Sequence, residues 1–141
     1  MKLFLFVFLG ATLFAKEAVV IPHEGVREFS MNGNTLKGLA TKGAGAKELE
    51  IWHSSIAVGS STPRHVHESE EIFVILKGEI LAVIGEEEVF CSAPATLICP
   101  ADIPHQIFNV GAEPTDHFLV LRIDSKIHNA AGEEMNLPWR N

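Results

Sequence analysis

Three histidines and one glutamate have the residue types and the spacing of a metal site. His65 and His67 are two residues apart, so on an extended strand both imidazoles would point to the same face. Glu71 shares this parity, but a straight strand would place it about 20 Å from His65 at roughly 3.3 Å per residue. The sequence therefore predicts a turn over residues 68–70, after which Glu71 opens an antiparallel partner strand and its carboxylate returns to the histidines.

A third imidazole, that of His105, follows the loop at residues 100–104 and begins another apolar run. Three neutral nitrogens and one carboxylate suit a divalent transition metal: Mn, Fe, Co, Ni or Zn. On an octahedral ion these four ligands leave two positions open for water, O2 or a bidentate oxygen ligand. A tetrahedral zinc ion would be saturated by the same groups and would serve a structural role.

The spacing of these residues resembles the first sequence motif of the cupin superfamily. That motif reads glycine, five residues, H-x-H, three or four residues, glutamate, six residues, glycine. All five fixed positions are matched here, by Gly59, His65, His67, Glu71 and Gly78.

The second cupin motif is matched in part. Pro100, His105 and Asn109 stand at the family positions, whereas Pro94 and Asp102 stand where the family pattern has glycine. Glycine at these positions would permit a positive φ at no steric cost, so the departures concern the backbone of the loop and remove no ligand. The resemblance covers about residues 45–124. It implies a single antiparallel β-barrel of the jelly-roll type, with the metal held at its open end.

The pattern along the chain agrees with an all-β fold. Beyond residue 16 apolar residues recur with a period of two, and turn signals such as Asn32-Gly33 and Gly85-Glu86-Glu87 separate the runs. Many short strands at close spacing favour a barrel or sandwich over a parallel α/β sheet. The predicted strands cover residues 18–21, 28–31, 36–41, 47–58, 64–67, 71–76, 79–84, 88–91, 96–99, 106–110 and 117–123.

Length and charge narrow the class of protein. With 141 residues and 47% hydrophobic content, the chain is long enough for one domain with a real core. There are 18 acidic and 11 basic residues, for a net charge of −7. No basic stripe offsets this negative charge, so a nucleic-acid partner is not expected.

The first fifteen residues have the pattern of a signal peptide. Lys2 precedes a short apolar run, and Ala15 offers a small residue for cleavage. The run is too short for a comfortable membrane span of about 20 residues. We expect residues 16–141 to form the mature domain, exported to the periplasm or secreted, with no stable membrane anchor after cleavage. The alternatives are an uncleaved anchor or a first barrel strand.

Three further residues are candidates for a substrate pocket. His53 could line it, although a partly buried, hydrogen-bonded histidine is the favoured interpretation. His117 lies on a strand with two apolar faces, so parity does not say whether it points inward. Arg122 could receive a substrate carboxylate, although a salt bridge at the barrel rim is favoured.

The two cysteines, Cys91 and Cys99, are the only ones in the chain. In an exported protein they could form a disulfide across the intervening loop. Both adjoin apolar residues, however, and two separate buried thiols are the favoured interpretation.

The reaction class is the least determined property. Tyrosine is absent, which excludes mechanisms that need a phenol as acid or base. By analogy with the family, we expect an exported metal enzyme that binds a small oxygen-rich substrate, with a dioxygenase-type oxidation favoured and a lyase or isomerase next. The alternatives are a binding module without turnover and a barrel whose histidines hold no metal. The resemblance also suggests a homodimer, with the exposed-looking Leu137 and Trp139 as a contact.

Overall fold

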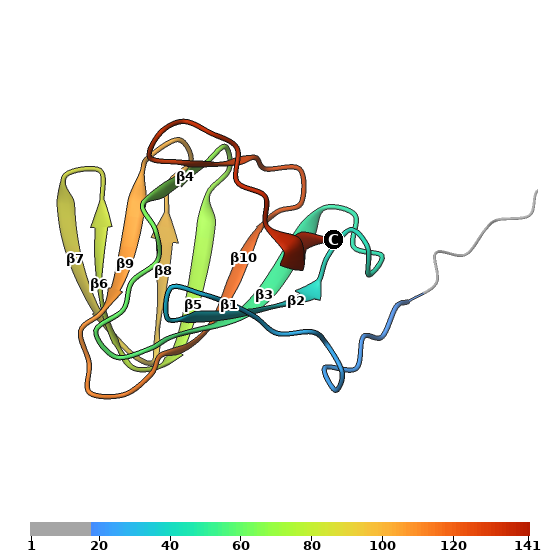
Figure 1. The fold of residues 1–141 in the computed structure, drawn as a ribbon, viewed down its shortest axis with the longest axis horizontal. Helices are drawn as coiled ribbons and strands as arrows, with labels where there is room; N and C mark the ends of the chain where they lie inside the picture. The colour runs from blue at the N-terminus through green and yellow to red at the C-terminus, as the bar shows by residue number, and fades with distance from the viewer. Residues whose placement is uncertain (1–17) are drawn as a thin grey trace, which may run out of the picture.

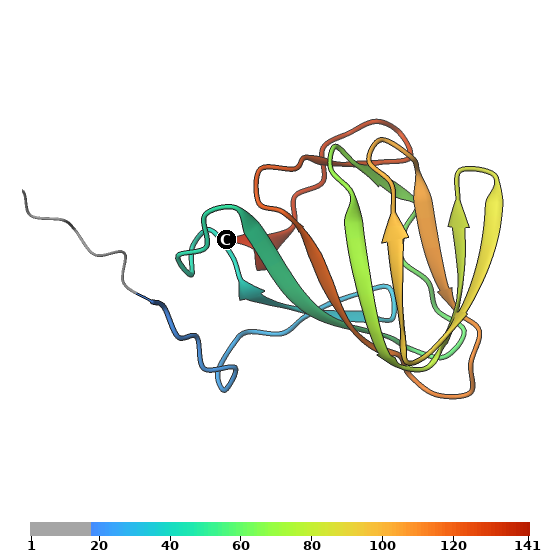
Figure 2. The same cartoon turned by 180° about the vertical axis from the view of Figure 1, so that it is seen from behind.

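The computed structural model describes residues 18–141, which form two antiparallel sheets facing each other (Figures 1 and 2). This confirms the all-β, jelly-roll prediction. The larger sheet contains, in spatial order, β1 (Phe29–Met31), β2 (Asn34–Ala40), β3 (Leu49–Ile56), β10 (Asp116–Arg122), β5 (Glu71–Lys77) and β8 (Ala95–Cys99). The smaller sheet contains β11 (Ile127–Asn129), β4 (His65–His67), β9 (His105–Asn109), β6 (Glu79–Ile84) and β7 (Glu87–Ser92).

The predicted signal peptide lies outside the described residues. Within residues 18–141, no helix has the length and apolar character needed to cross a membrane. The one helical element there is the short 3-10 helix η1 (Pro138–Arg140).

Period-two alternation builds the core between the sheets. On β5, Phe73 and Ile75 are buried while the residues between them are partly exposed, and β9 contributes the fully buried Ile107 in the same way. Burying one such side chain contributes about 1.5–3 kcal/mol to stability. The sheets are therefore held together by their inward faces, which also fixes which side chains reach the interior.

Two strand predictions differ from the structure. Residues 18–21 form no strand, since Val19 and Val20 are 64% and 85% exposed and find no sheet edge to pair with. Apolar β-branched residues alone do not make a strand, because the packing partner supplies most of the preference. Conversely, β11 has a single buried apolar residue, Ile127, and its pairing with β4 gives it its structure.

The chain does turn after His67, as predicted, but with a different result. It bends at Glu68 and Ser69, and Glu71 begins β5. However, β5 does not pair with β4: β4 lies between β11 and β9, and β5 lies between β10 and β8 in the opposite sheet. The prediction of an antiparallel β4–β5 pair is therefore wrong. The turn carries the chain across the barrel, so Glu71 faces the histidines instead of sitting beside them.

The C-terminal segment docks on its own barrel. Leu137 and Trp139 are buried, at 7% and 5% exposure, so the prediction that they are exposed partner contacts is wrong. Trp139 packs edge-on against Trp52, with ring centroids 5.6 Å apart. Figure 1 shows this segment lying against β2 and β3. A Cβ on Gly38 of β2 would come within 2.0 Å of the Trp139 carbonyl oxygen, so this close approach requires glycine.

An ion pair fixes the end of this segment. Arg140 Nε lies 2.7 Å from Oε1 of Glu50, whose side chain is almost fully buried, and an Arg140 amino group donates to the Ile123 carbonyl oxygen at 3.1 Å. Burial raises the pKa of Glu50, even though the hydrogen bond and charge of Arg140 oppose that rise. The pair therefore stands at the barrel wall and closes the tail over the interior.

Candidate metal centre

The structure brings together the four predicted ligand residues from three strands. His65 and His67 point inward from β4, His105 begins the neighbouring β9 opposite His65, and Glu71 begins β5 in the facing sheet. One donor atom from each residue lies within 4.8 Å of every other. His67, Glu71 and His105 are buried, and His65 is partly buried. This distance range allows a single cation to touch all four groups.

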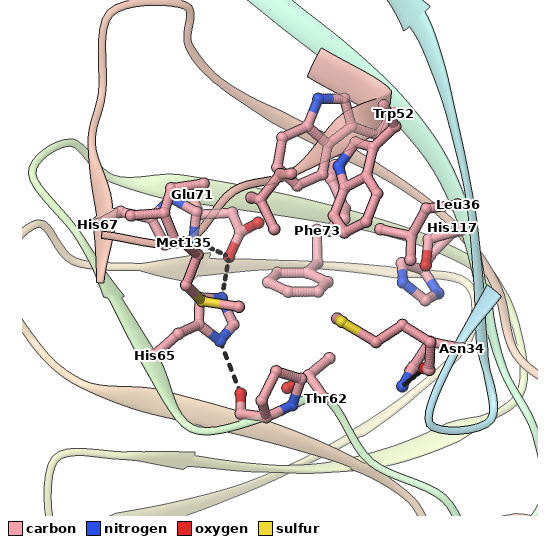
Figure 3. Close-up of a pocket in the computed structure, with 17 residues that line it drawn as sticks. Asn34, Leu36, Trp52, Thr62, His65, His67, Glu71, Phe73, His117 and Met135 are labelled. Atoms are coloured by element: carbon pink, nitrogen blue, oxygen red, sulfur yellow. Dashed lines mark hydrogen bonds and ion pairs between the residues drawn. The ribbon is translucent and has the colours of Figure 1, made fainter. Parts of the chain in front are cut away.

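The Glu71 carboxylate is the focus of the cluster. Its Oε2 atom lies 2.9 Å from His105 Nε2, 3.2 Å from His67 Nε2 and 3.7 Å from His65 Nε2. Figure 3 shows Glu71 between His67 and His65 at one end of a pocket. Three imidazole nitrogens therefore converge on one carboxylate oxygen.

Backbone carbonyls fix which ring nitrogens face the cluster. His65 Nδ1 donates to the Pro63 carbonyl oxygen at 2.7 Å, and His105 Nδ1 donates to the Ile103 carbonyl oxygen at 3.1 Å. A carbonyl can only accept, so in each neutral ring the proton sits on Nδ1 and Nε2 keeps its lone pair. Hydrogen bonds of this kind commonly orient metal-binding histidines.

This arrangement fits a cation better than it fits the protein alone. Lone pairs on Nε2 cannot donate to a carboxylate oxygen, which also only accepts. His67 is 1% exposed, and neither of its ring nitrogens has a hydrogen-bond partner among residues 18–141. Buried polar atoms without partners are costly. A divalent ion would accept all of these lone pairs at once.

The ionisation state of Glu71 agrees with this role. Burial alone would raise its pKa, but the charge of His67 and hydrogen bonds from the three imidazoles hold the pKa well below its usual range. For His65, burial opposes the charged form, yet the hydrogen bond and charge of Glu71 leave its pKa raised. The carboxylate is therefore ionised near neutral pH, as a metal ligand must be.

An apolar pocket adjoins the cluster inside the barrel. Its cavity volume is about 50 Å3. Aromatic and aliphatic side chains form most of the wall, including Trp52, Phe73, Leu119, Met135 and Trp139. Among the described residues that line it, Glu71 is the only carboxylate and no lysine or arginine is present. The pocket thus suits a ligand with an apolar body.

The three candidate pocket residues have different positions. His117 is 2% exposed and lines the pocket, and burial lowers its pKa to about 4, so it is neutral near pH 7. His53 faces the outside of β3, where its Nε2 contacts Asp116. Arg122 is exposed and pairs with Asp124 at 2.6 Å, which is the rim salt bridge that the sequence favoured. In the described chain, neither His53 nor Arg122 lines this pocket.

The predicted alternative of a disulfide between Cys91 and Cys99 is wrong. Both thiols are free in the described chain. Cys91 lies on β7 and Cys99 on β8, and these strands belong to different sheets. Burial raises the pKa of Cys99 to about 12, so this thiol is inert.

Several pocket residues carried no signal in the sequence. Asn34 follows the Asn32-Gly33 turn, and both turn residues have positive φ, as a two-residue hairpin requires. Met135, Leu137 and Trp139 come from the tail, which has no clear period. Their place in the pocket depends on long-range packing, and no local pattern could have revealed it.

The loop before His105 accommodates the missing family glycine. Asp102 has a φ of +61°, in the left-handed region that glycine enters freely, and its amide donates to the His67 carbonyl oxygen at 2.8 Å. The aspartate therefore takes the backbone conformation that the family pattern provides for by glycine.

Replacing Asp102 by glycine should leave metal affinity unchanged and raise the free energy of unfolding by at most about 1 kcal/mol. Relief of the left-handed strain is partly offset by the greater freedom of glycine in the unfolded chain. Urea denaturation and metal titration would measure both quantities. Asp102→Ala is the control and should lower stability by about 1 kcal/mol. Loss of metal binding in Asp102→Gly would show that the aspartate itself acts at the site.

Comparison with known proteins gives the same picture. The family model described as "Cupin domain" matches residues 52–121. An auxin-binding protein from Nicotiana tabacum, T85, is 32% identical over 111 residues, covering 72% of this chain and 58% of the relative. The chain spans about half the length of the curated relatives it matches.

Solved structures share the fold at lower identity. The polyketide cyclase RemF from Streptomyces resistomycificus has a TM-score of 0.68 at 16% identity, covering 88% of this chain and 90% of its own. A predicted oxalate decarboxylase from Thermotoga maritima has a TM-score of 0.63 at 22% identity, covering 72% of this chain and 96% of its own. At these identities the likeness concerns the fold alone.

Proposed function

This chain belongs to the cupin superfamily, and we propose that it is a metal-dependent binding protein for small, largely apolar organic acids. One observation carries the proposal: four donor atoms within 4.8 Å of one another stand beside an apolar pocket. His65, His67, Glu71 and His105 would hold the ion. When bound there, a divalent transition metal supplies Lewis-acid coordination of a ligand oxygen and, if it is redox-active, reaction with O2.

Charge balance favours an acid as the ligand. A divalent ion and the Glu71 carboxylate together leave one positive charge in an otherwise uncharged pocket. His117, which also lines the pocket, is neutral because its pKa lies at about 4. A net charge is costly in a low-dielectric interior. One carboxylate on the ligand would neutralise it, and the aromatic walls would receive the apolar body.

Binding is favoured over proton-transfer chemistry by the pocket's composition. Glu71 is committed to the metal cluster, His117 is neutral, and the described pocket lining offers no other acid or base. A lyase or isomerase would need such a group. The relatives carry the name auxin-binding protein, which also supports a role in small-ligand binding.

Dioxygenase-type oxidation is the second candidate. Four protein ligands on a six-coordinate ion leave two positions, enough for an acid oxygen and O2. Such a reaction does not depend on a protein acid or base, so the same pocket would serve it.

We also propose export and self-association. Residues 1–15 would be removed as a signal peptide. The outer face of the larger sheet carries Leu49, Ile51, Leu76 and Ile98 in exposed positions, which supports a homodimer through this face. Intact mass and sedimentation of the purified protein test both proposals. The mature chain should begin at Lys16 and sediment as a dimer, whereas an uncleaved chain or a monomer would refute the corresponding proposal.

Calorimetric titration tests the main proposal. Zinc-loaded protein should bind phenylacetate or 3-phenylpropionate at least about tenfold more tightly than metal-free protein, since the carboxylate loses its coordination partner without the ion. The methyl esters are the matched controls and should bind weakly in both states. Equal binding with and without metal would contradict the proposal. Oxygen uptake by the iron-loaded protein with these acids would favour the oxidation candidate instead.

A further inference from the structure

The pocket has a second polar end, away from the metal ligands. His117 and Asn34 both line the pocket, and they are 2% and 3% exposed. In Figure 3 they lie at one side of the pocket, while His65, His67 and Glu71 lie at the other, with Phe73 between. Within the described chain, His117 Nε2 and Asn34 Oδ1 have no hydrogen-bond partner. Two buried polar atoms therefore remain unpaired at the far end of an apolar pocket.

The protonation of His117 follows from its neighbour Thr115. The Thr115 hydroxyl oxygen accepts a hydrogen bond from the Ile56 amide at 2.8 Å and lies 3.1 Å from His117 Nδ1. Thr115 is buried, and Nδ1 is the only acceptor available to its hydroxyl proton within residues 18–141. The hydroxyl must therefore donate to Nδ1, which places the ring proton of the neutral imidazole on Nε2. His117 offers an unpaired N–H donor to the pocket.

Asn34 offers the complementary acceptor. Its side-chain amide nitrogen donates to the Met31 carbonyl oxygen at 3.0 Å and to the Ser61 carbonyl oxygen at 2.9 Å. Carbonyls accept only, so the network fixes the nitrogen on that side and leaves Oδ1 as the unpaired acceptor. Asn34 and His117 flank β3 from either side, opposite Ile56 and Ser54 respectively.

We propose that these two residues form a distal subsite for a hydroxyl group on the ligand. The inference rests on the proposed function and narrows its ligand class to acids whose hydroxyl lies at the end opposite the carboxylate. A hydroxyl both accepts and donates, so it can accept from His117 Nε2 and direct its own proton towards the acceptor side of the subsite. A second carboxylate would find no cation there.

The pocket walls allow such a ligand to be accommodated. Met31 and Met135 line the cavity, and methionine side chains adapt to the shape of what they contact. The body of the ligand would lie against Phe73 and Trp52, between its two polar ends. The ligand is thereby held at both ends, which would select for length as well as for chemistry.

Matched pairs of acids test the subsite. Zinc-loaded protein is titrated with phenylacetate and 4-hydroxyphenylacetate, with 3-phenylpropionate and its 4-hydroxyphenyl analogue, and with hexanoate and 6-hydroxyhexanoate. For at least one pair the hydroxy acid should bind about tenfold more tightly, because a buried donor left unpaired penalises the parent acid. His117→Phe should reduce this ratio to about one. His117→Gln, whose amide N–H can replace Nε2–H, should retain most of it.

The controls separate this inference from the proposed function. His128→Phe, a histidine substitution on β11 outside the pocket, should leave the ratio unchanged, and thermal unfolding checks that each variant folds. If the acids bind with metal but no pair shows a hydroxyl preference, the polar atoms hold only water and the subsite is refuted. A preference that survives in His117→Phe also refutes it. If no acid binds the zinc-loaded protein, the proposed function fails, and the subsite fails with it.

Discussion

Replacing His67 by alanine should lower the affinity for divalent metal at least about hundredfold and leave the barrel folded. Loss of a residue that merely orients a ligand costs about 10–100-fold, so loss of a direct ligand should cost no less. The metal-free fold should change little, because the ring nitrogens of His67 have no hydrogen-bond partner in the described chain and their removal breaks no bond. We expect its free energy of unfolding to change by less than about 2 kcal/mol.

Metal titration and thermal unfolding measure these two effects together. In the parent protein, bound metal should raise the melting temperature, since a ligand of the folded state stabilises it. In His67→Ala this rise should disappear at the same metal concentration. His128→Ala, a histidine change on the strand that pairs with β4, should keep the full rise. An unfolded His67→Ala variant, or one with parental affinity, would contradict the assignment.

Replacing Trp139 by alanine should lower the free energy of unfolding by about 3–5 kcal/mol. Its ring is buried against Trp52 and lies 6.3 Å from the ring of Phe29, so truncation opens a cavity beneath the tail. Affinity for the acid ligand should fall, because Trp139 lines the pocket. Metal affinity should stay within a few-fold of the parent, because the four ligand residues come from β4, β5 and β9.

Urea denaturation and calorimetry check this second result. Phe90→Ala removes an aromatic ring that is 62% exposed on β7, and it should change stability by less than about 0.5 kcal/mol. If Trp139→Ala were as stable as Phe90→Ala, the tail would not be docked on the barrel in solution.

The sequence predicted the fold and the metal cluster because local patterns carry both. The spacing of His65, His67 and Glu71 and the distant His105 gave the ligand set, and the structure brings these residues together. The turn after His67 followed from strand geometry alone. Its outcome did not, because parity along one strand cannot distinguish a neighbouring strand from one in the facing sheet. That choice depends on how the barrel closes.

Other features depended on long-range packing. His117 lies on a strand with two apolar faces, and its inward direction follows from pairing with both β3 and β5. Trp139 is buried because β2 offers it the backbone of Gly38, which no pattern in the tail indicates. Val19 and Val20 have strand-forming side chains but no partner edge, so they remain outside the sheets. In each case the deciding contact lies far away in the sequence.

Anomalous diffraction from crystals of the tag-free protein loaded with cobalt or zinc tests the central claim most directly. We predict one strong peak at about 2.0–2.2 Å from a nitrogen of His65, His67 and His105 and an oxygen of Glu71. A peak at another location, or one from which the His105 ring points away, would contradict a shared ion at this site.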